Sequence, residues 1–196
     1  MQYPASISAE ELSQLESVDF GGPIVVVSDV DEDFAEAMDY LKGQTVIGFD
    51  TETKPCFTSN SPRHHVALLQ LSGADKAYIF RLNLLGLPAP LASVLSDDRI
   101  VKVGAAVKED VRGLYYYRKF TPRSFVDLQT IVAEYGITDK SVRKMSAIIL
   151  GKKVSKTQQL SNWEAPQLSG AQLKYAAIDA WVCREMYLRL KSEGGK

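Results

Sequence analysis

The stretch Val46-Ile47-Gly48-Phe49-Asp50-Thr51-Glu52 is the most informative part of this chain for its fold. Its apolar first half predicts a buried strand, and two acids follow at the end of that strand. Because residues two apart on a strand point to the same side, Asp50 and Glu52 share a face. An acidic pair in this position more often just enters a loop, so the pair alone does not establish a site.

Two further acids interrupt the apolar faces of predicted helices. Asp179 shares a stripe with Ala176 and Cys183, and Asp110 interrupts a stripe that includes Val107. An unpaired buried carboxylate is expensive to desolvate, so each of these acids needs a partner. A lysine or arginine could be that partner. Four acids that converge, however, would repel one another unless a cation joined them, and the four together indicate a site for divalent metal ions.

Length and composition are those of an ordinary globular domain. The 196 residues are 45% hydrophobic and 24% charged, which fits one domain with a full core. No apolar run is long enough to cross a bilayer and the N-terminus carries no secretion signal, so we expect no membrane partner and a cytoplasmic location. Two cysteines, Cys56 and Cys183, do not make a disulfide framework, which agrees with a reducing compartment.

The remaining pattern predicts strands first and helices alternating with strands later. Strands are expected over residues 24–27, 45–52, 66–72, 76–80, 100–104 and 125–127. Helices are expected in a short stretch after Ser8 and over residues 31–42, 87–95, 107–117, 128–135, 141–150 and 169–192. Capping boxes at Ser8-x-x-Glu11 and Ser169-x-x-Gln172 mark two of the helix starts, and Gly73-Ala74-Asp75 marks a hairpin. This order is typical of an α/β domain with a mixed sheet.

The net charge of −1 argues weakly against a large, general nucleic-acid surface. Positive charge is nevertheless concentrated in two segments. Six lysines and arginines and no acid lie between Lys140 and Gln159, and four lie between Val111 and Val126. Such runs usually form solvated faces. Acids at one site with bases on flanking segments suit a polyanion that is handled with metal ions.

Three motifs resemble those of the DEDD 3′–5′ exonucleases: Phe49-Asp50-Thr51-Glu52-Thr53, Val103-Gly104 with Asp110 and Leu114, and Tyr175-Ala176-Ala177-Ile178-Asp179-Ala180. The tyrosine subclass fits, because Lys174 stands where the histidine subclass would carry its histidine. The chain looks most like ribonuclease D and the Werner-syndrome-type exonuclease domain. The stretch from Lys156 to Trp163, followed by Leu168-Ser169, supports that branch.

The resemblance implies an RNase H-like fold, a central mixed sheet flanked by helices, in a single domain. The exonuclease domain would span residues 23–192, after an N-terminal extension with a short helix (1–22) and before a tail (193–196). It also implies hydrolysis from the 3′ end of a nucleic acid, DNA or RNA, with release of nucleoside 5′-monophosphates. Asp50, Glu52, Asp110 and Asp179 would hold two divalent cations, and Tyr175 would position the attacking water.

All-carboxylate ligation selects hard cations, so Mg²⁺ or Mn²⁺ is expected. With two ions, one would activate water and the other would stabilise the leaving oxygen.

Further residues are candidates for contacts with the substrate. We expect Thr51 and Thr53 at the terminal sugar and phosphate. Upstream phosphates would follow the basic stretch, with Lys152, Lys153 and Lys156 as contacts. Trp163 is either a stacking platform for a base or a core residue packed against the last helix. The histidines His64 and His65 fit a surface pair or phosphate contacts better than metal ligands.

Two alternatives to an active exonuclease stay open. One is a non-catalytic nucleic-acid-binding or scaffolding domain with an inherited fold, which the presence of all four acids and Tyr175 argues against. The other is a small-molecule phosphodiesterase, which the basic segments disfavour.

Overall fold

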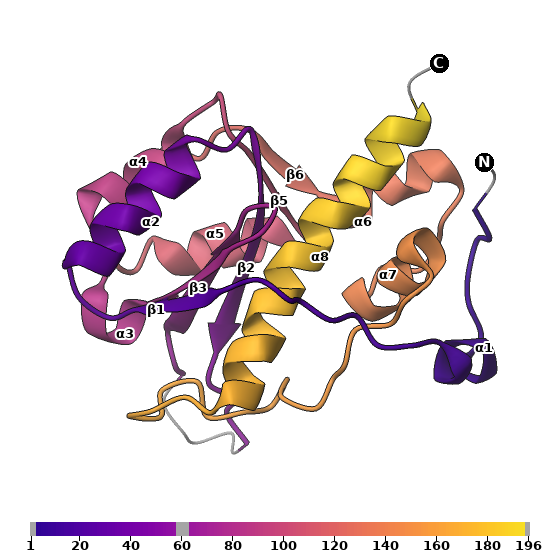
Figure 1. Ribbon diagram of the computed structural model, residues 1–196, viewed down its shortest axis with the longest axis horizontal. Coiled ribbons are helices and arrows are strands. Elements are labelled where there is room, and N and C mark those ends of the chain that lie inside the picture. Colours follow the sequence, from indigo (N-terminus) through magenta and orange to yellow (C-terminus); the bar gives the residue numbers. More distant parts are fainter. Residues whose placement is uncertain (1–2, 58–62, 195–196) are drawn as a thin grey trace.

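The computed structural model describes residues 3–57 and 63–194, and its centre is a six-stranded mixed sheet (Figure 1). The strands are β1 (Ile24–Val27), β2 (Val46–Thr53), β3 (Val66–Ser72), β4 (Ala77–Arg81), β5 (Val101–Gly104) and β6 (Phe125–Asp127). They lie in the order β1-β4-β3-β2-β5-β6, with β2, β3 and β4 antiparallel and the other pairs parallel. Residues 1–2 of the expected extension and residues 195–196 of the expected tail lie outside the described residues.

The expected strands are confirmed to within one residue at each end, because the hydrophobic pattern that predicts a strand lies within the strand itself. Every residue of β3 and β4 is buried, as their apolar runs predict. The predicted hairpin between them closes with the Gly73 N–H donating to the Lys76 carbonyl at 3.0 Å. A side chain at Gly73 would collide with Tyr40, whose hydroxyl lies 2.2 Å from the place of a Cβ atom. A larger residue at this turn would therefore force the Tyr40 side chain to move.

The helices agree with the expected ones less closely. They are α1 (Ala9–Gln14), α2 (Glu32–Lys42), α3 (Leu82–Leu85), α4 (Ala89–Ser96), α5 (Val107–Leu114), α6 (Leu128–Ile131), a 3₁₀ helix η1 (Val132–Tyr135), α7 (Val142–Leu150) and α8 (Gly170–Gly194). Both capping boxes are confirmed. The short α3 was not expected, α5 ends three residues early, and the helix expected to reach Tyr135 tightens into η1 after Ile131.

Helices cover both faces of the sheet and form two cores. The long α8 packs on one face together with α7, while α2, α4 and α5 pack on the other (Figure 1). Contact between α8 and β2 depends on Gly48, because a Cβ atom there would lie 1.8 Å from the Ala180 carbonyl oxygen. Glycine thus lets the backbone of α8 approach β2 two residues before Asp50. No helix in the described part of the chain is long and apolar enough to cross a membrane.

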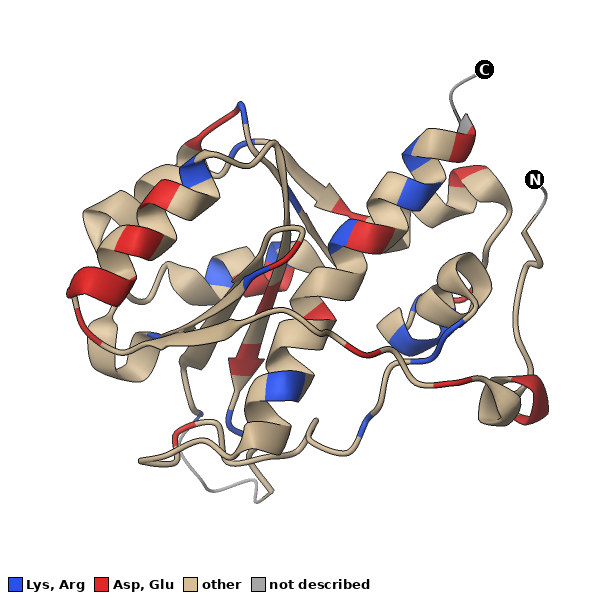
Figure 2. Ribbon diagram, viewed as in Figure 1, with Lys and Arg blue, Asp and Glu red and all other residues tan. Residues whose placement is uncertain are grey.

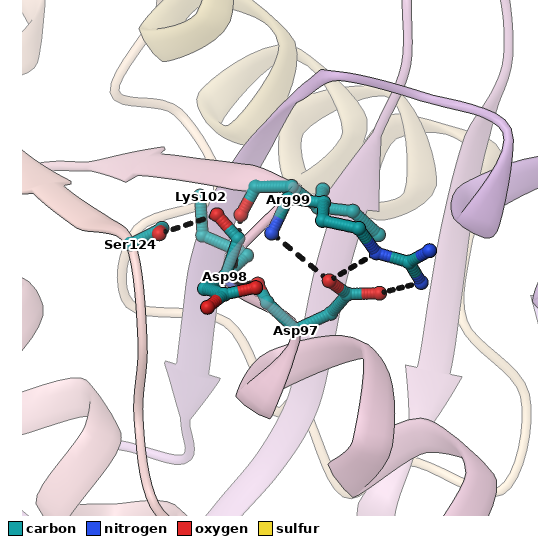
Figure 3. A network of polar contacts seen from close by, with 6 residues as sticks. Asp97, Asp98, Arg99, Lys102 and Ser124 are labelled. Atoms are coloured by element: carbon teal, nitrogen blue, oxygen red, sulfur yellow. Dashed lines mark hydrogen bonds and ion pairs between the residues drawn. The ribbon is translucent and has the colours of Figure 1, made fainter.

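A polar network fixes the start of β5 (Figure 3). Lys102 is fully buried, and its Nζ donates to the carbonyls of Asp97 at 2.6 Å and Ile100 at 2.7 Å. Burial lowers the pKa of Lys102 to about 8. The Asp97 carboxylate accepts from Arg99 Nε and Nη2, and the Ser124 hydroxyl donates to the Asp98 carbonyl. This cluster lies at the opposite end of β5 from Gly104, so we assign it to the stability of the sheet.

Candidate functional site

Three carboxylates converge where β2 ends against α8. Each of Asp50, Glu52 and Asp179 offers one oxygen, and these oxygens lie within 4.8 Å of one another. Figure 2 shows acidic positions of β2 beside an acidic position on α8. The alternation of β2 turns Asp50 and Glu52 to the face that α8 covers, and the close approach at Gly48 brings Asp179 to them. We call these three residues the acid trio.

Burial and mutual repulsion make the acid trio hard to ionise. Burial, followed by the charges of Asp179 and Asp110, raises the pKa of Glu52 to about 9. The pKa of Asp50 is raised well above its usual range by burial and then by the three other acids. Burial raises the pKa of Asp179 to about 7. Raised pKa values of this kind are typical of clustered carboxylates at cation-binding sites.

The acid trio fits a hard divalent cation. Among residues 3–57 and 63–194, no lysine or arginine forms a salt bridge with any of the three, which removes the alternative of a structural ion pair. All the donors are carboxylate oxygens, the ligands that Mg²⁺ and Mn²⁺ prefer. A cation would also offset the repulsion that raises the pKa values. The residues present therefore suit the expected metal ions.

The fourth acid, Asp110, lies beside the acid trio without joining it. Asp110 is in the first turn of α5, and its Oδ1 accepts a hydrogen bond from the Thr51 hydroxyl at 2.6 Å. Burial raises the pKa of Asp110 to about 6, although the bond from Thr51 opposes that shift. Its charge contributes to the raised pKa values of Asp50 and Glu52. Thr51, expected at the substrate, uses its hydroxyl to hold this acid at the edge of the site.

Asp127 fixes the helix that carries Asp110 and is not among the residues predicted from the sequence. Its carboxylate accepts from the N–H groups of Ala106 and Val107 at 3.2 Å and of Gln129 at 2.9 Å. Ala106 has a φ of 60°, the left-handed conformation that an alanine adopts only where its surroundings hold it. The signal that could have found Asp127 is its place at the end of a predicted strand, as for Asp50.

Tyr175 lies one helical turn before Asp179 and forms a hydrogen bond with it. Burial and the nearby acids raise the pKa of Tyr175 further above its usual value, so its hydroxyl keeps its proton. Its ring lies 5.9 Å from that of Trp163, centroid to centroid. Trp163 is fully buried. This corrects the expectation of a base-stacking platform in favour of the alternative, a core residue packed against the last helix.

A pocket of about 310 Å³ opens over the acid trio. Its opposite wall comes from the start of α7 and from residues 154–159, and three basic side chains line that wall: Lys140, Arg143 and Lys156. Lys156 thus lines the pocket, and its expected contact with substrate phosphates stays a prediction. Arg143 belongs to the same basic stretch but was not singled out, and its Nε is buried without a hydrogen-bond partner among the described residues. Acids and bases thus face each other across this acid pocket.

Two of the expected lysine contacts lie elsewhere. The Nζ of Lys153 donates to the Ser13 carbonyl at 2.6 Å, and that of Lys152 lies 3.9 Å from Glu16. Both lysines therefore face the N-terminal extension instead of the acid pocket, which corrects that part of the expected phosphate track. Thr53 is exposed at the end of β2 and does not line the pocket.

The two histidines take different positions. The ring of His65 stacks on that of Tyr116, and Nδ1 of His64 lies 2.9 Å from Glu164. Both histidines lie outside the acid trio.

Comparison with known proteins matches residues 25–194 to the family described as 3′–5′ exonuclease. The chain belongs to this 3′–5′ exonuclease family. The fly protein "Exonuclease 3'-5' domain-containing protein 2" from Drosophila melanogaster is 36% identical over 149 residues, which cover 74% of this chain and 25% of that protein. Ribonuclease D from Gluconacetobacter diazotrophicus is 28% identical over 180 residues, which cover 89% of this chain and 45% of the relative.

The solved structures confirm the expected fold of this exonuclease domain. The EXO domain of Nibbler from Aedes aegypti superposes with a TM-score of 0.78 at 23% sequence identity, covering 92% of each chain. The RNase H-like architecture, a mixed sheet flanked by helices in one domain, is therefore confirmed, as is the resemblance to ribonuclease D. The chain spans less than half the length of the two sequence relatives above.

Proposed function

We propose that this exonuclease-family chain removes nucleotides one at a time from the 3′ end of a nucleic acid, using two Mg²⁺ or Mn²⁺ ions held by Asp50, Glu52 and Asp179, with Asp110 at the edge. The observation that carries the proposal is a trio of carboxylates, half-buried at Asp50 and Glu52 and buried at Asp179, that has no salt bridge within residues 3–57 and 63–194 and shares an open pocket with three basic side chains. Its relatives' names, an exonuclease domain protein and a ribonuclease D, support the same activity.

The chemistry needs little from the protein beyond binding and orientation. When bound, divalent cations supply positive charge to the phosphate and lower the pKa of water. The water oxygen bonds to phosphorus, the bond from phosphorus to the 3′ oxygen of the preceding nucleotide breaks, and that oxygen takes a proton. The terminal residue then leaves as a nucleoside 5′-monophosphate. Lys140, Arg143 and Lys156 on the opposite wall supply positive charge for the substrate phosphates.

Tyr175 suits the orientation of the attacking water. Its protonated hydroxyl sits beside Asp179 and cannot act as a base at neutral pH. It can hold a water molecule in line with the phosphorus atom.

We place the substrate in the class of nucleic acids with a free 3′ end, DNA or RNA. The cytoplasm is the compartment that the cysteine content favours. We propose that the exonuclease domain spans residues 23–192, and the family match over residues 25–194 supports this proposal.

An oligonucleotide assay tests the proposal. Single-stranded DNA, single-stranded RNA and duplexes with recessed ends, each labelled at the 5′ end, are incubated with the chain and Mg²⁺. We expect a ladder that shortens from the 3′ end, release of nucleoside 5′-monophosphates, and complete arrest by EDTA. Binding of these oligonucleotides without any cleavage would instead support the non-catalytic alternative.

Tyr175→Phe should slow cleavage by about 10²-fold without weakening metal binding, because the variant loses the group that aligns the water but keeps every carboxylate. Single-turnover rates measure the first effect, and Mn²⁺ titration followed by electron paramagnetic resonance measures the second. A variant that cleaves at the native rate would remove Tyr175 from the mechanism.

Lys156→Glu should raise the KM for single-stranded oligonucleotides about tenfold and flatten the dependence of binding on salt, because a phosphate contact is lost. Lys152→Glu is the matched control, since that side chain faces the N-terminal extension, and its KM should stay within about twofold of native. The comparison is made by steady-state kinetics over a range of salt concentrations. Equal effects of both variants would show that the phosphates do not follow the wall of the acid pocket.

A further inference from the structure

A second hollow, of about 360 Å³, adjoins the acid pocket. The two share Val154, Ser155 and Tyr175 in their linings. The remaining walls of the second hollow come from Thr157, from α8 and from the N-terminal extension, which contributes Ser17, Val18 and Asp19. A substrate bound at the acid trio therefore has a second cavity within reach, on the other side of Tyr175.

The N-terminal extension forms a fixed wall of this hollow. We call residues 16–20 the N-terminal strap, which runs beside α8 before β1 begins (Figure 1). The Val18 N–H donates to the Lys153 carbonyl at 2.8 Å, and the Lys153 N–H donates to the Glu16 carbonyl at 2.9 Å. Val18 and Phe20 are buried, so the strap is anchored through its side chains as well as its backbone.

The lining of the hollow has the chemistry that a nucleobase needs. Its apolar part comes from Val18, Val154 and Ile178, and hydroxyl groups come from Ser17, Ser155 and Thr157. The first set offers contacts to the faces of a flat ring, and the second offers hydrogen bonds to its edge. The volume falls within the range of about 300–1,000 Å³ that is usual for small-ligand sites.

A phosphate group fits the hollow poorly. Among the described residues that line it, the single basic one is Lys174, whose Nζ lies 2.6 Å from the carboxylate of Asp19. That ion pair is neutral overall, so none of the described lining residues presents an unpaired positive charge to the cavity. The acid pocket, by contrast, carries three basic side chains. The difference assigns phosphates to the acid pocket and an uncharged ring to the second hollow.

We propose that this hollow, the strap pocket, binds one unpaired base of the nucleic acid next to the cleaved bond, so that the N-terminal strap is part of the substrate site. The inference rests on the proposed exonuclease function and adds a substrate class to it. A base held in a duplex cannot enter a cavity of this kind without leaving its partner. The strap pocket therefore favours single-stranded 3′ ends over paired ones.

Filling the strap pocket tests the inference. Ala171 lines it from the first turn of α8 and is exposed, so Ala171→Trp places a ring in the cavity without disturbing the core. Ser17→Phe fills it from the strap as a second variant. Ala35→Trp is the matched control, an exposed alanine in the first turn of α2 on the opposite face of the sheet. Thermal unfolding confirms that each variant is folded.

The substrates are single-stranded oligonucleotides with one abasic nucleotide at the terminal, second or third position from the 3′ end. For the native chain, we expect kcat/KM to fall about tenfold at the one position whose base enters the strap pocket. In Ala171→Trp and Ser17→Phe, kcat/KM for the normal oligonucleotide should fall by a similar factor, and the abasic position should cause no further loss. Ala35→Trp should behave as native.

The outcomes separate the two proposals. If the native chain cleaves no oligonucleotide at all, the proposed function fails. The strap pocket does not bind a base if the native chain cleaves but both filled variants keep its kcat/KM for the normal oligonucleotide. The same conclusion follows if an abasic nucleotide lowers kcat/KM as much in the filled variants as in the native chain.

Discussion

Asp179→Asn should abolish hydrolysis, by about 10³-fold or more, and at the same time make the metal-free protein more stable at pH 8. The activity falls because the acid trio loses one of its three carboxylates. The stability rises because the remaining acids no longer face the Asp179 charge, which contributes to the raised pKa of Asp50 and Glu52. Burial raises the pKa of Asp179 to about 7 although a hydrogen bond from Tyr175 opposes the shift, so ionising Asp179 costs more free energy in the folded state than in the unfolded state. We expect a gain of about 1–3 kcal/mol in unfolding free energy.

Urea denaturation in EDTA measures the stability, and the oligonucleotide assay measures the activity. Asp139→Asn is the control, because the Asp139 carboxylate lies 2.9 Å from Lys144 and its pKa is lowered by that partner. This variant should lose about 1 kcal/mol or less and keep its activity. An Asp179→Asn protein that is less stable than native without metal would show that the acid trio is not under repulsion.

Metal-free protein should lose stability as the pH rises from about 4 to about 9, and Mg²⁺ should restore it at the upper end. Folding raises the pKa of Asp110 to about 6, of Asp179 to about 7 and of Glu52 to about 9. Unfolded carboxyls titrate near pH ~4, so between these limits the folded chain binds more protons than the unfolded chain. The unfolding free energy therefore decreases with pH over that window.

A cation that binds only the folded, ionised site reverses this loss. At a concentration about 100-fold above its Kd, it contributes about 2.7 kcal/mol, or a rise in Tm of about 5–10 °C for a domain of this size. We expect most of that rise at pH 8 and little at pH 5, where protons compete for the carboxylates. Scanning calorimetry with and without Mg²⁺ or Mn²⁺ measures it. If Tm rose equally at both pH values, the cation would be bound away from the carboxyl groups whose pKa values are raised.

The acid trio could be predicted because its geometry follows from local periodicity. The pleat of the 46–53 strand puts Asp50 and Glu52 on one face, and the helical stripe puts Asp179 toward the sheet. Gly48 marks the close approach that joins them. The metal-binding pattern is thus encoded within short stretches, which also explains why the strand limits were predicted so closely.

The basic wall could not be predicted in the same way, because its members are selected by tertiary contacts. Lys153 and Lys156 lie three residues apart in one charged run. Lys153 nevertheless donates a hydrogen bond to the Ser13 carbonyl of the N-terminal extension, while Lys156 lines the acid pocket. A count of charges cannot separate them. Trp163 is a similar case, since its complete burial depends on its packing near Tyr175. Asp127 accepts hydrogen bonds from the backbone N–H groups of Ala106 and Val107, and its place at the end of a predicted strand marks the residue without revealing these contacts.

The location of a bound cation tests the central claim most directly. Crystals soaked in Mn²⁺ give an anomalous signal that places the ion without reference to activity. We predict at least one Mn²⁺ site bound by carboxylate oxygens of Asp50, Glu52 and Asp179, and its loss in Asp179→Asn crystals. Mn²⁺ bound only elsewhere on the chain, with the acid trio empty at saturating concentration, would contradict the account.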